Sequence, residues 1–528
     1  MSGQMYNLIM ASVPSFYSGD QGEFTIPKDR FLEYTEASIK GQFQSLDQGA
    51  INKLKNLPTM FAVEDEVADS RIGEITDIKV NSNNLRIKYR FDKDYYPLTR
   101  GLLKEKQQKL DIDDFEFHRG HWAVKKCDIS EFYGEYLKSL AGIAHKLKNT
   151  DKKVQLIYAF NGTGKTRLSR EFKKIIAPKG DGQDAIDGVE STPLSRHKIL
   201  YYNAFTEDLF YWDNDLDADA QPKLKIQPNT FTDWILKEVK DQGQDQNIID
   251  NFQRYTNDKL TPQFNPKYKN GENVVPAFSE ITFSFKRGDD ENLPPLKISK
   301  GEESNFIWSI FYTLINQVID VLAVPELENR ETDQFNQLEY IYIDDPVSSL
   351  DENHLIELAV DLAQLIKRTP EHTVKFIVST HNPLFFNVLY NELNANSCYL
   401  LEKFEDGNFE LKDKKGGANS SFSYHLYLKQ LIEQAIKDNE VQRFHFNLLR
   451  NLYEKAASFL GYQNWTDLLP EDKTLYAKRV MHFYSHRSLS SEEVAEPTGP
   501  EKQIVKFLLD HLLNNYGFKL QGKANAKS

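Results

Sequence analysis

Alternation of apolar and polar residues predicts strands in the first part of the chain. The stretch GEITDIKVNSNNLRIKYRF, residues 73–91, reads as two strands joined by a polar turn at Asn81 to Asn84. HWAVKKCDI, residues 121–129, has the pattern of another strand, and irregular and helical sequence comes first. We therefore predict a small β-rich N-terminal domain over residues 1–128.

Apolar strands alternate with helical stretches from residue 129 to 405. After the helical EFYGEYLKSLAGIAHKL, the segments QLIYAF, KILYYNAF, EYIYIDD and VKFIVST have the apolar composition of strands that are buried on both faces. This alternation is typical of an α/β domain with a largely parallel sheet. Residues near 180–292 are polar and in places rich in Pro and Gly, which indicates an insertion in this domain.

The last part of the chain, residues 406–528, is predicted to be an all-helical domain. A charged hairpin-like stretch after Phe404 leads into its helices. From Val441 to Ser528 there are 12 Lys and Arg against 9 Asp and Glu, although the net charge of the whole chain is −13. The acidic body, which is the chain before residue 441, argues against a protein that binds nucleic acid over its whole surface. The mildly basic C-terminal segment instead fits an RNA of the size of a tRNA.

The composition favours a soluble protein of several domains. The chain has 528 residues, of which 40% are hydrophobic and 12% aromatic, and this length exceeds one ordinary core. Cys127 and Cys398 stand far apart in the sequence, which excludes a disulfide framework or a zinc knuckle. No window approaches the ~20 uninterrupted apolar residues of a membrane span, and the N-terminus lacks the basic region of a signal peptide. We therefore expect a cytoplasmic protein with no membrane partner.

A nucleotide-binding motif follows the first apolar strand of the α/β region. AFNGTGKT, Ala159 to Thr166, stands between a strand and a helix, where backbone N–H groups converge on a phosphate. We expect Lys165 to reach the β- and γ-phosphates and Thr166 to ligate Mg²⁺, while Gly162 and Gly164 keep the loop open. Ala159 replaces the usual first glycine of the motif. The candidate ATP-binding residues here are Asn161, Gly162, Thr163, Gly164, Lys165, Thr166 and Arg167.

Paired carboxylates end a later apolar strand. IYIDDPVSSLD, residues 341–351, places Asp344 where it can hold Mg²⁺ together with Thr166, and Asp345 where it can orient the attacking water. A further apolar strand ends in THNPLF, where His381 is positioned to sense the γ-phosphate. These residues predict Mg²⁺-dependent hydrolysis of ATP.

The motifs resemble those of the ABC-type ATPases, the superfamily that includes the RecF-like, SMC-like and double-strand-break-repair ATPases, over about residues 150–402. The resemblance implies an ABC-type P-loop ATPase head that forms a homodimer with ATP sandwiched between two copies, and it allows a higher assembly. Most transporter-like members have Glu at the position of Asp345. A Q-loop glutamine is not identifiable, and YYNAFTEDLF, residues 201–210, occupies the corresponding region.

The same resemblance implies a signature segment that reaches the ATP of the partner subunit. ISKGEESNFIWSIFYTLI, which begins at Ile298, looks like a variant of it, with Ser299, Gly301 and Glu302 as candidate ATP contacts. The alternative for these residues is a plain helix cap running from Ser299 to Glu302. Residues 348–351 would form the loop that crosses the dimer interface.

Two helices near the C-terminus carry a candidate ribonuclease site. FNLLRNLYEKAASFLGY presents Arg450 and Glu454 on one helix face, and YAKRVMHFYSHRS carries His482 and His486. A pair such as Arg450 and Glu454 is most often a surface ion pair of little energetic value. Together, however, an Arg, a Glu and a His can cleave RNA without metal. The 2′-hydroxyl attacks, one group takes its proton, another protonates the leaving oxygen and the Arg stabilises the phosphorane.

Arg450, Glu454 and His486 resemble the Arg-Glu-His triad of the bacterial anticodon nucleases, in which an ABC-type ATPase half precedes a ribonuclease half. The spacing, four residues and then 32, is similar to the family's. Arg479 to His486 also resembles the Arg-x₄₋₆-His motif of HEPN-type ribonucleases, which implies a HEPN-like C-terminal domain. The resemblance implies an anti-phage defence ATPase whose ATP-bound dimer controls cleavage of tRNA or another RNA and thereby arrests translation. Residues 1–128 have no counterpart in these compact nucleases.

Two other functions stay open at this point. Septu-type defence ATPases carry similar helices while a separate HNH protein cuts, so this chain could instead be a regulatory subunit that senses infection and controls a separate effector nuclease or toxin. A RecF-like DNA repair clamp requires a broad basic surface, which the acidic body does not offer. The sequence shows no HNH Cys/His array, Toprim cluster or PD-(D/E)xK pattern for metal-dependent cutting.

Overall fold

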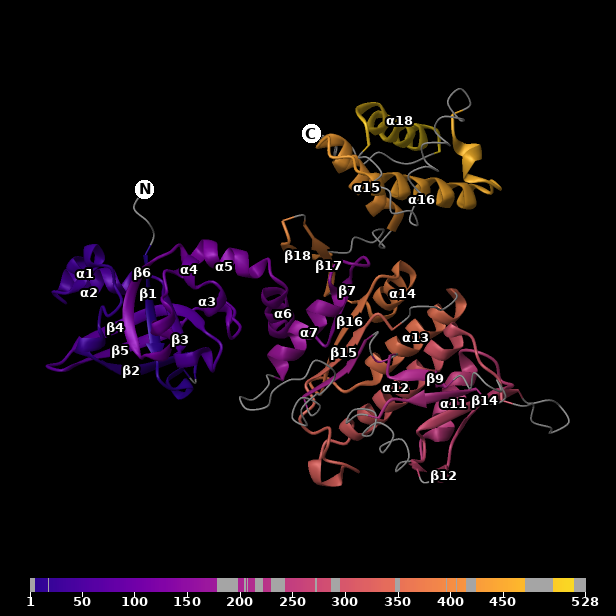
Figure 1. The fold of residues 1–528 in the computed structure, drawn as a ribbon, viewed down its shortest axis with the longest axis horizontal. Helices are drawn as coiled ribbons and strands as arrows, with labels where there is room; N and C mark the ends of the chain where they lie inside the picture. The colour runs from indigo at the N-terminus through magenta and orange to yellow at the C-terminus, as the bar shows by residue number, and fades with distance from the viewer. Residues whose placement is uncertain are drawn as a thin grey trace, which may run out of the picture. The chain divides into compact units, whose positions relative to one another are not determined.

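The computed structural model falls into two compact units, Met1–Lys415 and Gly416–Ser528 (Figure 1). The structure describes residues 5–17, 19–177, 198–203, 206, 208–213, 222–228, 243–270, 273–285, 295–346, 352–395, 397–404, 406–414, 424–470 and 497–516.

A six-stranded sheet with the order β2-β5-β4-β3-β1-β6 forms the beginning of the first unit. Strands β1 and β3 are parallel, and the other neighbours are antiparallel. The strands are β1 (Met5–Ala11), β2 (Gln21–Pro27), β3 (Thr59–Val63), β4 (Arg71–Val80), β5 (Asn84–Phe91) and β6 (His121–Lys126). Its helices are η1 (Pro14–Tyr17), η2 (Lys28–Arg30), α1 (Ala37–Phe43), α2 (Gln48–Lys55), η3 (Glu64–Glu66), α3 (Leu102–Glu105), α4 (Gln107–Leu110), η4 (Asp114–His118) and α5 (Ile129–Leu137).

Helices cover both faces of this sheet where strands β1, β3 and β6 are buried on both sides. Ile9 of β1 packs in a core with residues of α1 and α2, whereas its neighbour Leu8 packs in a second core with residues of α3, α4 and α5. At the hairpin predicted within residues 73–91, β4 and β5 pair antiparallel, with Val80 opposite Leu85. Every second residue of β5 is buried, which is the alternation read from the sequence.

A second six-stranded sheet, with the order β18-β17-β7-β16-β15-β8, forms the centre of the α/β part. All neighbours are parallel except β17 and β18. The strands are β7 (Val154–Tyr158), β8 (Ile199–Tyr202), β15 (Tyr340–Asp344), β16 (Lys375–Thr380), β17 (Cys398–Lys403) and β18 (Phe409–Asp413). The surrounding helices are α6 (Leu140–Asn149), α7 (Lys165–Ile176), α12 (Lys300–Leu322), η5 (Leu327–Asn329), α13 (Glu352–Arg368) and α14 (Pro383–Leu393). Figure 1 shows α6 and α7 beside β7, with α12 and α13 on the other side of the sheet.

Strand β18 lies beyond residue 405, where the sequence analysis placed the end of the ATPase domain. It pairs antiparallel with β17, with Leu401 opposite Leu411, and its apolar residues join the core under α6 and α7. Residues 409–413 of the charged hairpin-like stretch after Phe404 therefore belong to this sheet, because Phe409 and Leu411 are apolar and buried.

A polar insertion was predicted near residues 180–292. Its described residues form a four-stranded antiparallel sheet with the order β11-β14-β10-β9. Phe252 and Phe283 pack on Phe306 of α12, with ring centroids 5.5 and 5.1 Å from that of Phe306, so this sheet shares an apolar core with α12. Its elements are β9 (Phe210–Asp213), β10 (Lys223–Ile226), α11 (Asp245–Arg254), β11 (Leu260–Phe264), the β12–β13 hairpin (Tyr268–Asn270 and Asn273–Val275) and β14 (Glu280–Phe285).

Helix α12 is long and apolar enough to cross a membrane, a feature that the sequence analysis did not identify. However, 89% of its most apolar window is buried inside the protein. Trp308 and Phe311 contact Tyr202 of β8, with ring centroids 5.3 and 4.8 Å apart. The helix is apolar on all sides because it lies between the parallel sheet that contains β8 and the four-stranded sheet that contains β14.

The second unit is helical in its described part. Its elements are α15 (Tyr424–Lys437), α16 (Arg443–Leu460), η6 (Trp465–Leu468) and α18 (Gly499–Asn515). Phe446, Leu449 and Tyr453 of α16 pack against Leu508 and Leu512 of α18 in a separate core. Tyr453 also donates a hydrogen bond to the Leu508 carbonyl at 2.8 Å.

Candidate functional site

The predicted phosphate-binding loop joins the centre of the parallel sheet to helix α7. Strand β7 ends at Tyr158 and α7 begins at Lys165. Gly162 and Gly164 have φ angles of 79° and 110°, in the left-handed region that favours glycine. Ala159, which replaces the usual first glycine, is fully buried in the core, and its N–H donates to the Thr380 carbonyl at 3.0 Å. Its methyl group therefore fits at this position.

Lys165 lies with its ammonium group under this loop. Its Nζ donates to the carbonyls of Ala159 and Phe160 at 3.2 and 3.4 Å and to Asn161 Oδ1 at 3.3 Å. It also lies 3.5 Å from Asp345 Oδ2. The lysine of the loop and the second carboxylate of the Asp-Asp pair are therefore direct neighbours.

Asp344 connects the end of β15 to the beginning of α7. Its side chain is buried, with Oδ2 accepting from Thr166 Oγ1 at 2.8 Å and Oδ1 accepting from Ser379 Oγ at 2.7 Å. Burial raises the pKa of Asp344 above its ordinary value, although both hydrogen bonds oppose this shift. A hydroxyl and a carboxylate side by side are oxygen ligands of the kind that Mg²⁺ prefers, so Thr166 and Asp344 fit this ion.

Asp345 is held between Lys165 and His381. Its Oδ2 lies 2.5 Å from His381 Nδ1, and Oδ1 accepts from Thr380 Oγ1 at 3.2 Å. Burial acts to raise the pKa of Asp345, but the hydrogen bond from His381 and the charge of Lys165 outweigh it and lower the pKa. The residue has a φ of 56°, a left-handed conformation that Asp and Asn tolerate better than most residues.

Tyr201, Ser379 and Thr380 belong to this site, and the sequence analysis did not single them out. Tyr201 Oη lies 2.6 Å from Ser169 Oγ of α7 and accepts from Asn203 Nδ2 at 2.8 Å, and burial raises its pKa to about 12. Tyr201 and Asn203 stand in YYNAFTEDLF, so this segment reaches the helix after the loop. Ser379 and Thr380 directly precede His381. Their position at the end of an apolar strand could have indicated that they contact the Asp-Asp pair.

The proposed signature residues begin helix α12. Ser299 is the N-cap, its Oγ accepting from the Glu302 N–H at 3.3 Å, and Glu302 Oε2 accepts from the Ser299 N–H at 2.7 Å. The structure thus has the capping box that the sequence analysis gave as the alternative. Contact of Ser299, Gly301 and Glu302 with ATP stays a prediction, and residues 348–351 lie outside the described residues.

In the C-terminal unit the structure brings two of the three predicted ribonuclease residues together. Arg450 Nε donates to Glu454 Oε1 at 2.7 Å, and the Arg450 guanidinium lies 5.7 Å from the ring centre of Trp465. Side-chain exposure is 20% for Arg450 and 44% for Glu454, so a ligand can reach the pair. Arg479, His482 and His486 lie outside the described residues.

Gly164 can be tested against Gly162, because both have positive φ angles but only one is crowded. A Cβ on Gly164 would lie 3.3 Å from Phe409 and 3.7 Å from Leu140, whereas a Cβ on Gly162 would meet nothing within 4 Å. Gly164→Ala is therefore expected to weaken ATP binding more than Gly162→Ala, which has only the backbone penalty of roughly 1–3 kcal/mol. Titration of both variants with a fluorescent ATP analogue measures the difference, and equal affinities would contradict the crowding at Phe409.

The glycine loop after β7, the Thr166–Asp344 pair and the Asp345–His381 pair meet at the carboxyl edge of a parallel sheet, and together they define a P-loop ATPase. A family model described as an AAA domain matches residues 282–504. The chain is also 62% identical over 373 residues to an anticodon nuclease of Escherichia coli. That alignment covers 71% of this chain and 91% of the relative. The chain belongs to the anticodon nuclease family.

Solved structures that resemble the chain are heads of SMC proteins. The Smc head domain with a coiled coil and joint from Pyrococcus yayanosii is 16% identical, with a TM-score of 0.21, and the match covers 35% of this chain and 30% of that one. The SMC head domain from Thermotoga maritima is 14% identical, with a TM-score of 0.22, over 51% of this chain and 92% of that one.

Proposed function

We propose that this protein is a cytoplasmic anti-phage defence nuclease in which an ATP-bound homodimer controls metal-independent cleavage of tRNA in the anticodon, which arrests translation. The observation that carries the proposal is the 62% identity to an anticodon nuclease over 91% of that protein. The P-loop ATPase site and the Arg450–Glu454 pair support it.

The ATPase half uses residues that already contact one another. Lys165 and the loop N–H groups bind the β- and γ-phosphates, and Thr166 with Asp344 would hold Mg²⁺. Bound Mg²⁺ supplies positive charge next to the phosphate oxygens. Asp345 orients the attacking water and accepts its proton, while His381, hydrogen-bonded to Asp345, keeps that carboxylate in place and faces the γ-phosphate.

In the assembly proposed here, each nucleotide is shared by two chains. Ser299, Gly301 and Glu302 at the start of α12 contact the γ-phosphate held by the partner subunit, and residues 348–351 cross the interface. Ser299 and Gly301 stand at the N-terminus of a 23-residue helix, whose dipole favours an anion there, and the phosphate would replace the Glu302 carboxylate at the Ser299 N–H. Such dimers can stack into a higher assembly and take a separate trigger protein.

The ribonuclease half cuts RNA by internal attack. The 2′-oxygen bonds to the neighbouring phosphorus, the bond from phosphorus to the 5′-oxygen breaks, and a 2′,3′-cyclic phosphate and a 5′-hydroxyl result. Glu454 and His486 supply the two proton transfers, one from the 2′-hydroxyl and one to the 5′-oxygen. Arg450 stabilises the charge on the phosphorane.

The proposal is tested with wild type, His486→Ala and the control His372→Ala, an exposed histidine of the first unit. Sequencing of small-RNA ends after expression is expected to show breaks within tRNA anticodon loops for wild type and the control, and intact tRNA for His486→Ala. Purified wild type with ATP and Mg²⁺ should make the same breaks.

Two results would separate this function from the regulatory alternative. If wild type and His486→Ala are equally toxic and tRNA stays intact, the chain is not the nuclease. Toxicity that requires a protein encoded beside this gene would then favour an ATPase subunit that controls a separate effector.

A further inference from the structure

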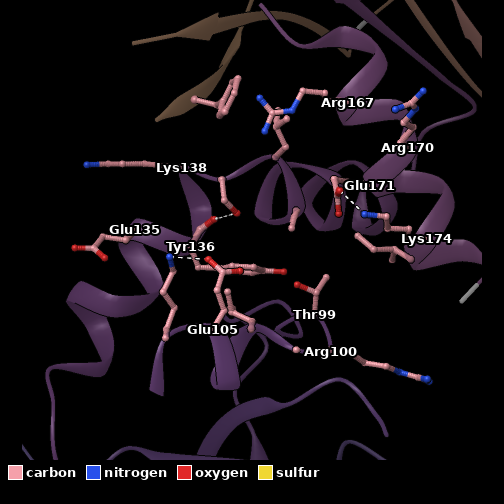
Figure 2. Close-up of a pocket in the computed structure, with 18 of the residues that line it drawn as sticks. Thr99, Arg100, Glu105, Glu135, Tyr136, Lys138, Arg167, Arg170, Glu171 and Lys174 are labelled. Atoms are coloured by element: carbon pink, nitrogen blue, oxygen red, sulfur yellow. Dashed lines mark hydrogen bonds and ion pairs between the residues drawn. The ribbon is translucent and has the colours of Figure 1, made fainter. Parts of the chain in front are cut away.

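A large cleft opens within the first unit, beside the ATP site, and we call it the basic cleft. It has a volume of about 1180 Å³ and is lined by the segment from Thr99 to Lys106, by residues of α5, α6 and α7, and by the β17–β18 turn at 407–409. Figure 2 shows Arg167 and Arg170 of α7 on one side of it and Arg100 and Glu105 on the opposite side. Sites for small molecules usually enclose about 300–1,000 Å³, so this cleft suits a longer ligand.

The charge of the basic cleft is opposite to that of the chain. Seven Lys and Arg residues line it against four Asp and Glu, whereas the whole chain has a net charge of −13. Three of the cations pair with carboxylates of the same cleft: Lys106 with Glu105 at 2.8 Å, Lys174 with Glu171 at 2.8 Å and Arg100 with Asp69 at 4.0 Å. Exposed pairs of this kind are weak, so phosphate groups can compete for these side chains.

Helix α7 gives one of its faces to this cleft. Arg167, Arg170 and Lys174 follow one another at intervals of three and four residues and line it, while Lys165 and Ser169 lie on the opposite side of the helix. Phe409 and Leu140, which also line the cleft, are the side chains that a Cβ on Gly164 of the phosphate loop would meet. The cleft thus lies next to the phosphate loop and shares with it a helix, packing residues and Arg167, which was predicted to contact ATP.

A second hollow of about 720 Å³ adjoins the first. Both are lined by Lys138, Asn408 and Phe409, and the second adds Lys146 together with the carboxylates of Asp406 and Glu410. Asn408 Nδ2 donates one hydrogen bond to Asp406 Oδ2 at 2.7 Å, and its second N–H can donate to a phosphate or sugar oxygen. The excess of cations therefore lies in the first hollow, whose volume of about 1180 Å³ suits a chain of phosphates better than a single nucleotide.

We propose that the basic cleft binds a single strand of nucleic acid through its sugar-phosphate backbone. Tyr136 and Phe409 contribute apolar wall but are largely buried, so the strand is recognised mainly by its phosphates and with little sequence preference. This site is distinct from the phosphate loop and from the Arg450–Glu454 pair, and it does not depend on the ribonuclease proposal.

The test measures binding of a fluorescent single-stranded oligothymidylate of about ten nucleotides to the full-length protein by anisotropy. The cleft variant carries Arg100→Glu, Lys138→Glu and Arg170→Glu. The control carries Lys53→Glu, Arg86→Glu and Arg90→Glu, three exposed residues of the N-terminal sheet and α2, so the net charge changes equally. The cleft variant is expected to lose at least about tenfold in affinity, and the control far less.

Three results would overturn the proposal. Equal losses in the two variants would show that only overall charge matters, and an unchanged affinity of the cleft variant would place the strand elsewhere. Displacement of the strand by ATP, at a concentration just sufficient to saturate the phosphate loop, would place the strand on that loop.

If the cleft variant does not fold, the wild type still decides the question. An oligothymidylate that contains photoreactive thiothymidine is cross-linked to it, and the attached peptides are identified by mass spectrometry. Cross-links within residues 99–106, 138–141 or 167–174 support the site, and cross-links confined to other segments contradict it.

Discussion

Replacing Asp345 by Asn is expected to slow ATP hydrolysis by about 10²- to 10³-fold while ATP binding is retained. The carboxylate oxygen that approaches His381 at 2.5 Å and Lys165 at 3.5 Å is the group proposed to orient water and accept its proton. Asn keeps the size of the side chain and tolerates the left-handed backbone, so the loss is chemical. Removal of a negative charge next to the phosphates should tighten binding of ATP rather than weaken it.

Phosphate release under saturating ATP and titration with a fluorescent analogue measure the two effects separately. Asp320→Asn is the control, since it removes an exposed carboxylate of α12 that pairs with Arg368 at 3.0 Å. A turnover of Asp345→Asn close to that of the wild type would show that another group activates the water.

The second large effect is expected at the pair in α16. Arg450→Ala and Glu454→Gln should each reduce the rate of tRNA cleavage by about 10²- to 10⁴-fold. Each residue holds the other in place through the 2.7 Å bond between Nε and Oε1, so the double variant should be little worse than the more damaged single variant.

A surface ion pair gives the opposite pattern of results. If Arg450 and Glu454 only stabilise the helix, their substitution changes the free energy of unfolding by about 1 kcal/mol or less and leaves cleavage intact. Thermal melting of the same samples separates the two roles. Lys455→Ala, at the exposed neighbouring position, is the control and should change neither cleavage nor the melting temperature.

The neighbours at the ATP site could be predicted because they follow from local patterns. Asp344 ends one apolar strand and His381 follows another, and the carboxyl ends of parallel strands share one edge of a sheet. The hairpin of β4 and β5 was predictable for a similar reason, since alternation and a polar turn are both local in the sequence.

Other features depend on contacts between distant segments, which a local pattern does not contain. Tyr201 reaches Ser169 because β8 pairs with β15 in a register that places Tyr201 opposite Tyr342, 141 positions later in the chain. The basic cleft combines residues from Asp69 to Phe409, and its cations are spread among acidic neighbours. The count of charged residues along the sequence instead indicated an excess of Lys and Arg in residues 441–528.

The left-handed backbone at Asp345 also limits how this position can change in evolution. A single-base change can turn an Asp codon into one for Glu, the residue that most transporter-like relatives of this ATPase class have here. In this protein the longer side chain would have to adopt a φ of 56°, which Asp and Asn accept more readily, and still fit between Lys165 and His381. Drift from Asp to Glu should therefore require a second change in the turn after β15, so the two positions are expected to vary together among homologues.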